Sequence, residues 1–220
     1  MNKLFQTGDG SNSLMSEQFG VSYHSKHGAV QETQHVFIDA AFNHLSQTKI
    51  KILEIGFGTG LNALMTLQSN RMAKKQVEYV AVEAYPIAME TVDSLDYHTI
   101  LKDKTLETVL KTMHQLDAHV PTEIESNFKF EKRIMLFEDI DESNEYDIIY
   151  FDAFAPNAQP ELWDIELLSK MYHALRKGGI LTTYCAKGQV KRNLKSLGFT
   201  IESIPGPPGK REMTRAKKPL

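Results

Sequence analysis

The chain has 220 residues, of which 41% are hydrophobic and 24% are charged. This length and balance are typical of one globular domain and exclude a disordered or fibrous protein. The only cysteine, Cys185, excludes an internal disulfide and a zinc site built from thiolates. We therefore expect Cys185 to be a small buried residue in a protein that needs no oxidising compartment.

Charge and hydropathy bear on location and partners. The chain has no run of about 18 apolar residues and no N-terminal signal segment, so we expect a cytoplasmic protein with no membrane span. The net charge of −3 hides an asymmetry, because eleven Lys and Arg face two Glu from Arg176 onward. This basic segment suits an anionic partner and equally suits a set of solvated helix faces, so composition leaves both interpretations open.

The N-terminal part precedes the first clear element of a core. Residues 1–20 contain turn formers and little periodicity, which predicts a loose arm, and short strand-like pieces follow near residues 21–24. Residues 34–45 carry apolar side chains at helical spacing, and residues 49–55 form a short apolar run typical of a strand. We expect residues 21–220 to form one domain.

Strand and helix patterns alternate through the remaining chain. Residues 61–68 predict a helix that is apolar nearly all round, as in a helix packed on a sheet. Further predicted strands are residues 77–83, 133–137, 146–152, 179–184 and 199–204. This alternation predicts an α/β fold with a doubly wound, Rossmann-like, mainly parallel sheet.

Two segments interrupt the alternation. Residues 85–127 are longer than one crossover helix needs, so we interpret them as an insertion over the sheet edge, with helices near residues 87–94 and 106–116. Residues 205–209 have the sequence PGPPG, which cannot continue a helix or strand. Residues 210–216 beyond them are predicted to return as an edge strand.

A glycine-rich loop follows the first predicted strand. Gly56, Gly58 and Gly60 alternate directly after Glu54 and before a predicted helix, where a tight turn brings bare backbone close to a ligand. The spacing differs from GxGxxG and lacks the Lys-Ser/Thr ending of a P-loop, so a triphosphate site is not expected. Glycine-rich turns also occur where close packing requires them, so the surrounding motifs must distinguish a ligand-binding loop from a packing turn.

In that context the loop resembles the first motif of class I S-adenosylmethionine-dependent methyltransferases. The resemblance implies a seven-stranded sheet with an antiparallel last strand, and a site for S-adenosylmethionine. Glu54 is then associated with the cationic methionine end, and the glycines accommodate the sugar and amino acid parts. Glu83, at the end of the next strand, matches the carboxylate that binds the ribose hydroxyls, although a solvated strand-end glutamate is the plain alternative. The implied cofactor-binding set is completed by Asn62 in the loop segment and by Asp139 and Ile140 at the adenine.

A second motif follows the strand at residues 146–152. Asp152 ends this strand at the edge where doubly wound folds place their ligands, and Phe154 stands two residues later. Asp152 is a candidate general base and Phe154 a candidate wall of the pocket, with a structural strand cap as the alternative role for Asp152. The only tryptophan, Trp163, is expected in the core.

Four segments narrow the resemblance: residues 53–62 (LEIGFGTGLN), 152–163 (DAFAPNAQPELW), 183–192 (TYCAKGQVKR) and 209–213 (GKREM). Together they are similar to the methyltransferase domain of the tRNA 5-methylaminomethyl-2-thiouridine biosynthesis proteins of the MnmC type. The resemblance implies N-methylation of the 5-aminomethyl group on the wobble uridine, with the anticodon region of tRNA as partner. The flavin-dependent oxidoreductase half of those proteins is absent from these residues, so we expect a separate enzyme to supply the aminomethyl uridine.

Basic residues near the C-terminus are candidates for tRNA phosphate contacts. Lys187, Lys210 and Arg211 lie within the family-like segments, whereas Lys191 and Lys195 fit a solvated helix face equally well. The alternatives are a methyltransferase for a small-molecule or protein amine, and a non-catalytic tRNA-binding domain. The eight histidines are scattered, so no metal site is predicted, and a monomer is the default expectation.

Overall fold

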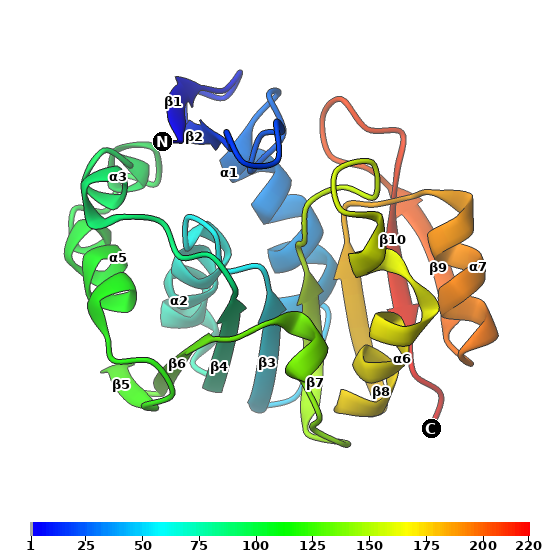
Figure 1. Ribbon diagram of the computed structural model, residues 1–220. Helices are drawn as coiled ribbons and strands as arrows, with labels where there is room; N and C mark the ends of the chain where they lie inside the picture. The colour runs from blue at the N-terminus through cyan, green and yellow to red at the C-terminus, as the bar shows by residue number, and fades with distance from the viewer. Residues whose placement is uncertain (1) are drawn as a thin grey trace.

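The strand β3 (Lys49–Ile55) shows how the centre of the fold is buried. Ile50 and Ile52 point into one hydrophobic cluster, and Leu53 and Ile55 point into a second cluster on the opposite face. A strand that is buried on both faces needs helices on both sides, and this explains its nearly continuous apolar sequence. The computed structural model describes residues 2–220 and has this three-layer arrangement (Figure 1).

The sheet has eight strands. Their order is β5 (Thr122–Glu125), β6 (Phe128–Ile134), β4 (Gln76–Glu83), β3, β7 (Tyr146–Phe151), β8 (Leu175–Thr183), β10 (Glu212–Lys217) and β9 (Thr200–Pro205). The pairs from β6 to β8 are parallel, whereas β10 is antiparallel to both its neighbours and β5 is antiparallel to β6. The doubly wound, mainly parallel sheet with an antiparallel last strand is therefore present.

Three strand predictions need correction. The sheet has one strand more than seven because the end of the insertion folds back as β5 on β6, through a turn with Asn127 at a φ of +68°. The final strand does not form an edge, because β10 inserts between β8 and β9, where Met213, Thr214 and Ala216 are fully buried. The pairing of Pro205 with Glu212 lets the intervening loop turn the chain back on itself.

The strand predicted at residues 133–137 lies earlier, as β6. Phe128 and Phe130 are buried and alternate with exposed or partly exposed residues, whereas Ile134 and Leu136 are 45% and 49% exposed. The more continuous apolar run in the sequence therefore belongs to the loop after the strand, at the carboxyl edge of the sheet. The prediction from hydrophobicity therefore placed the strand after Arg133, whereas most of the strand lies before it.

Helices cover the two faces separately. The first face carries α1 (Ala29–Thr33), the π-helix η1 (Gln34–Phe42), α2 (Leu61–Ala73) and the insertion helices α3 (Met89–Asp93), α4 (Tyr97–Ile100) and α5 (Thr105–Gln115). The second face carries α6 (Ile165–Ala174), α7 (Gly188–Ser196) and the 3-10 turns η2 (Phe137–Asp139) and η3 (Pro160–Trp163). The helix predicted at residues 34–45 is thus the π-helix η1, with α1 directly before it.

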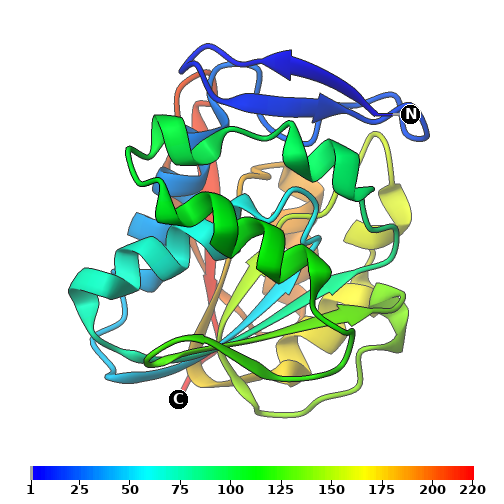
Figure 2. The same ribbon diagram turned by 90° about the vertical axis from the view of Figure 1, so that its left-hand side faces the viewer.

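The residues from Lys3 to Met15 contain two strands, where the sequence pattern predicted a loose arm. They form the hairpin of β1 (Lys3–Gln6) and β2 (Asn12–Met15), which lies above the insertion helices (Figure 2). The side chains of Thr7, Asp9 and Ser11 hydrogen-bond to one another in the turn, so polar residues that indicated a loop instead satisfy each other. Near residues 21–24 only an isolated bridge forms, between Met15 and Ser22.

Candidate active site

The glycine loop lies at the carboxyl edge of the sheet, between the ends of β4 and β7. Gly56, Gly58 and Gly60 have φ values of +91°, +52° and +80°, which are unfavourable for other residues. A Cβ atom on Gly56 would stand 2.8 Å from the carbonyl oxygen of Asp152. The turn is tight because the amides of Gly56 and Phe57 both donate to the carbonyl of Val82. Backbone is thereby exposed where a ligand can approach it.

Glu83 stands at the end of β4 beside this loop. Its Oε2 accepts the amide hydrogen of Gly58 at 2.8 Å, and its Oε1 accepts that of Tyr85 at 2.8 Å. Burial raises the pKa of Glu83, and the backbone donors oppose that shift because they favour the charged form. Each carboxylate oxygen keeps a further lone pair, so Glu83 can accept two more hydrogen bonds from a diol.

Asn62 hydrogen-bonds to two of the predicted acidic residues, Glu54 and Asp152. Its amide nitrogen donates to Glu54 Oε1 at 2.9 Å and to Asp152 Oδ2 at 2.8 Å. Its oxygen accepts the hydroxyl hydrogen of Thr33 at 2.9 Å, which determines which way the amide faces. Glu54 is fully buried, and its Oε2 has no hydrogen-bond partner among residues 2–220. Burial, followed by the charge of Asp152, raises the pKa of Glu54 well above its usual range.

Asp152 follows β7 and faces the same space. Its amide donates to the carbonyl of Ile55 at 3.0 Å, so the strand pairing of β7 with β3 continues to this residue. Burial and the negative charge of Glu32 raise the pKa of the Asp152 carboxyl to about 7, against the hydrogen bond from Asn62. A carboxyl group with this pKa can accept a proton and release it near neutral pH.

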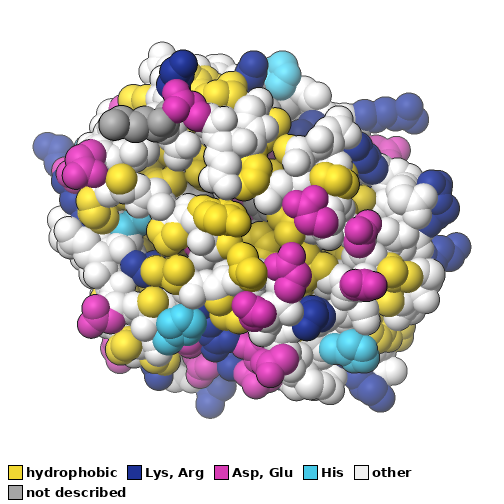
Figure 3. All heavy atoms as spheres, in the orientation of Figure 1, with side chains coloured by type: hydrophobic (Ala, Val, Ile, Leu, Met, Phe, Trp, Pro, Cys, Tyr) yellow, Lys and Arg dark blue, Asp and Glu magenta, His cyan; other side chains and the backbone are white. Residues whose placement is uncertain are grey.

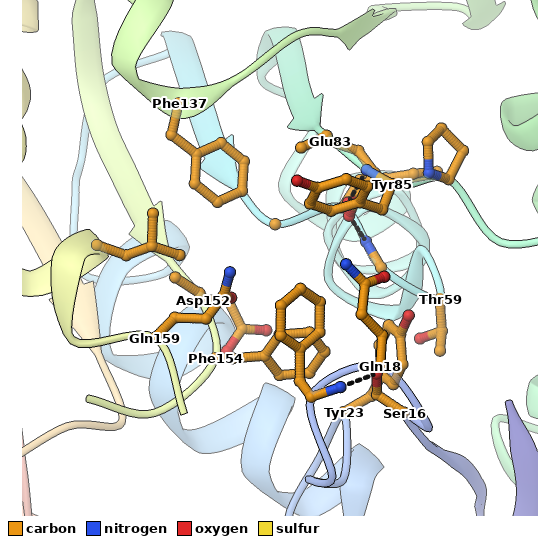
Figure 4. A pocket seen from close by; sticks show the side chains of 18 of the residues that line it. Ser16, Gln18, Tyr23, Thr59, Glu83, Tyr85, Phe137, Asp152, Phe154 and Gln159 are labelled. Carbon is orange, nitrogen blue, oxygen red and sulfur yellow. Dashed lines mark hydrogen bonds between the residues drawn. The ribbon is translucent and has the colours of Figure 1, made fainter. Parts of the chain in front are cut away.

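One cavity, of about 310 Å³, is lined by Gly56, Gly58, Asn62, Glu83 and Asp152. Figure 4 shows Glu83 and Tyr85 on one side of it, and Asp152, Phe154 and Gln159 on another. In the space-filling view, apolar side chains gather around a hollow in the middle of the same face (Figure 3). The cavity therefore combines an apolar lining with a few converging polar groups, as small-molecule sites commonly do.

One wall of this cavity has no signal in the sequence. Ser16, Gln18, Phe19 and Tyr23, which lie beyond the N-terminal hairpin, line it. The rings of Phe19 and Tyr23 lie 5.1 and 5.0 Å from that of Phe154, measured between centroids. These positions have no periodicity or motif, and only the fold brings them to the glycine loop.

A buried histidine ties this wall to the loop. The ring of His24 lies between Ser13 of β2 and Thr59 of the glycine loop, with its Nδ1 3.0 Å from the Ser13 hydroxyl and its Nε2 3.4 Å from the Thr59 hydroxyl. Burial lowers the pKa of His24 to about 4, so the ring is neutral at physiological pH. The N-terminal segment is therefore positioned without placing an extra charge at the cavity.

Four of the predicted cofactor residues do not line the cavity. Glu54 and Gly60 stand behind its wall, where they support Asn62 and begin α2. Asp139 is exposed and Ile140 is packed into the second hydrophobic cluster. The turn η2 instead presents the residues just before them, which are Leu136, Phe137 and Glu138.

The three predicted substrate residues come together at the surface. Lys187, Lys210 and Arg211 line a shallow cavity with Tyr184 and Glu212. Two of these side chains already have polar partners within the protein. The ammonium of Lys187 donates to the side-chain oxygen of Asn157, and that of Lys210 pairs with Glu32. The side chain of Arg211 is 95% exposed.

Two features, a cluster of metal-binding side chains and a membrane-spanning helix, are absent from residues 2–220. Within residues 2–220, no group of three or more His, Cys, Asp or Glu side chains is arranged to hold a metal ion. In the same part of the chain, no helix has the length and apolar character needed to cross a membrane.

Two known proteins with sequences similar to this chain share one name. The chain is 28% identical over 214 residues to the tRNA 5-methylaminomethyl-2-thiouridine biosynthesis bifunctional protein MnmC of Marinomonas sp. (strain MWYL1), covering 90% of this chain and 31% of that protein. It is 30% identical over 214 residues to the protein of the same name from Leptospira interrogans, covering 90% of this chain and 33% of the relative. The chain thus spans about a third of the length of these curated relatives.

Solved structures show the same fold. MNMC2 from Aquifex aeolicus has a TM-score of 0.80 and 24% identity, covering all of this chain and 72% of that one. The 1,6-didemethyltoxoflavin-N1-methyltransferase of Burkholderia thailandensis, solved with S-adenosylhomocysteine, has a TM-score of 0.53 and 12% identity, covering 86% and 80%. The sheet order is thus that of class I methyltransferases. Residues 97–219 match the family described as S-adenosyl-L-methionine-dependent methyltransferase, and the chain belongs to this family.

Proposed function

We propose that the cavity of about 310 Å³ holds S-adenosylmethionine against the glycine loop. The fit rests on two observations: a Cβ on Gly56 would be too close to the Asp152 carbonyl, and the Glu83 oxygens, which accept the amides of Gly58 and Tyr85, keep lone pairs to spare. Glu83 is assigned to the ribose hydroxyls, and Asn62 with Glu54 behind it to the cationic methionine end. Leu136, Phe137 and Glu138 replace Asp139 and Ile140 as the residues assigned to the adenine.

The proposed reaction is N-methylation of a 5-aminomethyl uridine at the wobble position of tRNA, which gives 5-methylaminomethyl uridine. The names of the MnmC relatives support this product. The observation that carries the proposal is Asp152, a carboxylate on the cavity wall whose pKa of about 7 suits it to take a proton from an alkylammonium. A small-molecule amine would satisfy the same carboxylate and is the second candidate acceptor.

The residues of the site have distinct duties in this reaction. When bound, S-adenosylmethionine would supply an electrophilic methyl group on its sulfonium sulfur, and the sulfur would keep the electron pair of the broken C–S bond. Asp152 accepts a proton from the acceptor ammonium, so that the amine nitrogen has a lone pair for the new N–C bond. Asn62 holds the Asp152 carboxylate in place. Phe154, with Phe19 and Tyr23, excludes water and offers a surface on which the extruded base can stack.

A tRNA acceptor also requires contacts to the phosphate backbone. Lys187, Lys210 and Arg211 form the proposed contact surface, and the exposed Arg211 is the most available of the three. We propose that a separate enzyme supplies the aminomethyl uridine, and that the protein works where tRNA is modified, in the cytoplasm. Affinity for tRNA should fall steeply as salt rises, because each phosphate contact releases counterions.

The deciding experiment is transfer of labelled methyl from S-adenosylmethionine to bulk tRNA from a strain that lacks this gene, followed by nucleoside analysis. Conversion of 5-aminomethyl to 5-methylaminomethyl uridine is the expected result. Cofactor binding without labelled tRNA contradicts the tRNA proposal and favours a small-molecule amine. Absence of cofactor binding favours a non-catalytic tRNA-binding domain.

A further inference from the structure

A second cavity, of about 410 Å³, lies on the other side of the segment that follows Asp152. Ala153 and Phe154 line both cavities, so this segment is a shared wall. The remaining lining comes from Met15, residues 20–26, Glu32 of α1, Ala155, Tyr184 after β8, and Lys210 in the loop before β10. Glu32, a charged residue of this second cavity, has no role in the methyl transfer proposed so far.

A buried ion pair lies in the second cavity. The side chain of Glu32 is 8% exposed, its Oε2 accepts the amide hydrogen of Ser25 at 2.8 Å, and its Oε1 pairs with the ammonium of Lys210. The same ammonium lies 3.9 Å from the centroid of the Tyr184 ring. A carboxylate and an aromatic face therefore hold one primary alkylammonium, and both interactions gain strength away from bulk water.

This ion pair is coupled to the proposed base. Thr33, next to Glu32, donates to Asn62, and Asn62 donates to Asp152. The hydroxyl of Tyr184 donates to the carbonyl of Ala153 at 2.8 Å. After burial, the charge of Glu32 is the largest cause of the raised Asp152 pKa, and Lys210 opposes it. Glu32, Tyr184 and Asp152 thus belong to one connected region.

We propose that Glu32 and the Tyr184 ring form the recognition site for the cationic amine of the acceptor, and that Lys210 occupies this site until the acceptor displaces it. The inference rests on the proposed function, because an aminomethyl group on a base is a primary alkylammonium like the Lys210 side chain. The exchange leaves the buried carboxylate paired, so no uncompensated charge is created. The displaced Lys210 is then free to contact a phosphate.

The exchange provides selectivity for the amine. An acceptor with a neutral 5-hydroxymethyl group cannot replace the ammonium, and it would leave either Lys210 in the site or Glu32 unpaired. Glu32 acts in recognition in the second cavity, and the amine then enters the cofactor cavity, where Asp152 takes one proton from its ammonium. The two carboxylates therefore divide binding and proton transfer between them.

The test uses the full chain loaded with S-adenosylhomocysteine and two anticodon stem-loop RNAs, one with 5-aminomethyluridine and one with 5-hydroxymethyluridine at the wobble position. The measured quantity is the ratio of the two Kd values, in which contacts to the phosphates cancel. The wild type should favour the aminomethyl RNA by about tenfold or more. Glu32→Gln should bring the ratio close to one without changing the Kd for S-adenosylhomocysteine.

Two further variants make the test decisive. Glu202→Gln also breaks an ion pair, with Arg215, but Glu202 does not line either cavity and should leave the ratio unchanged. Lys210→Met removes the resident ammonium and should increase the ratio several-fold, even if Glu32→Gln folds poorly.

The outcomes separate this inference from the proposed function. If Glu32→Gln retains the wild-type ratio, or Lys210→Met leaves it unchanged while the wild type methylates the aminomethyl RNA, only the recognition role is overturned. If the wild type binds neither RNA and methylates neither, the proposed function fails and the inference fails with it.

Discussion

The proposed cofactor side and the proposed acceptor side of the site are built in different ways. The glycine loop and Glu83 are held by backbone hydrogen bonds, within one strand–loop–helix–strand unit of consecutive chain. The acceptor side depends on side-chain pairs between distant segments, such as Glu32 with Lys210, which are 178 positions apart. Backbone anchoring suits a cofactor of constant shape, whereas side-chain pairs can exchange partners when an acceptor enters.

Asp152 lies where the two sides meet, so its loss should have the largest effect. Asp152→Ala should lower the rate of methyl transfer by about 10²–10⁴-fold, because it removes the group that takes the proton. The Kd for S-adenosylmethionine should change much less, and calorimetry measures it. Asp141→Ala removes an exposed carboxylate and should leave both quantities unchanged. Unchanged turnover in Asp152→Ala would remove this residue from the mechanism.

The rigidity of the cofactor side can be tested with a pair of glycine variants. Gly56→Ala forces a Cβ to within 2.8 Å of backbone and should cost about 1–3 kcal/mol in strain, with at least about tenfold weaker cofactor binding. Gly20→Ala has a similar φ, of +66°, but no atom within 4 Å of the added carbon, so it should cost about 1 kcal/mol and leave cofactor binding intact. Denaturant unfolding and calorimetry measure the two effects, and equal losses would contradict the proposed close approach.

Loss of the Glu83 charge should have a smaller effect, which concerns the affinity for S-adenosylmethionine. Glu83→Gln keeps the shape but loses the charge, which should weaken S-adenosylmethionine binding by about tenfold. Glu78→Gln, an exposed residue on the same strand, is the matched control and should have no effect. If both variants bind the cofactor like the wild type, Glu83 does not hold the ribose.

The smallest expected effects concern pH. Asp152 must be ionised to act as a base, so kcat/KM should rise with pH through about 7, and Glu32→Gln should move this limb to lower pH. The raised pKa means that the folded protein binds this proton more tightly than the unfolded chain does, so ionisation of Asp152 reduces stability as pH rises toward 7. Asp152→Asn should therefore raise Tm more at pH 8 than at pH 5, relative to wild type. Equal changes in Tm at the two pH values would show that folding does not raise the pKa of Asp152.

The order of residues along the chain was enough to predict the cofactor side. Glu54, Gly56, Glu83 and Asp152 all stand at the ends of apolar runs, and the carboxyl ends of parallel strands meet at one edge. Local order was misleading where hydrophobicity and structure diverged. The apolar residues before Asp139 form the cavity rim in place of a strand, so the residues facing the cavity are Leu136 to Glu138.

The sequence alone therefore indicated the fold class and predicted a methyl-donor site with Asp152 as its central carboxylate, because short-range patterns encode strands, turns and their order. Only the tertiary structure decided that the N-terminal segment with Gln18 and Tyr23 closes the cavity, and that Glu32, Tyr184 and Lys210 converge behind Phe154. Those contacts join residues that are far apart in the chain, and they arise from packing and charge pairing, which leave no periodic signal in the sequence.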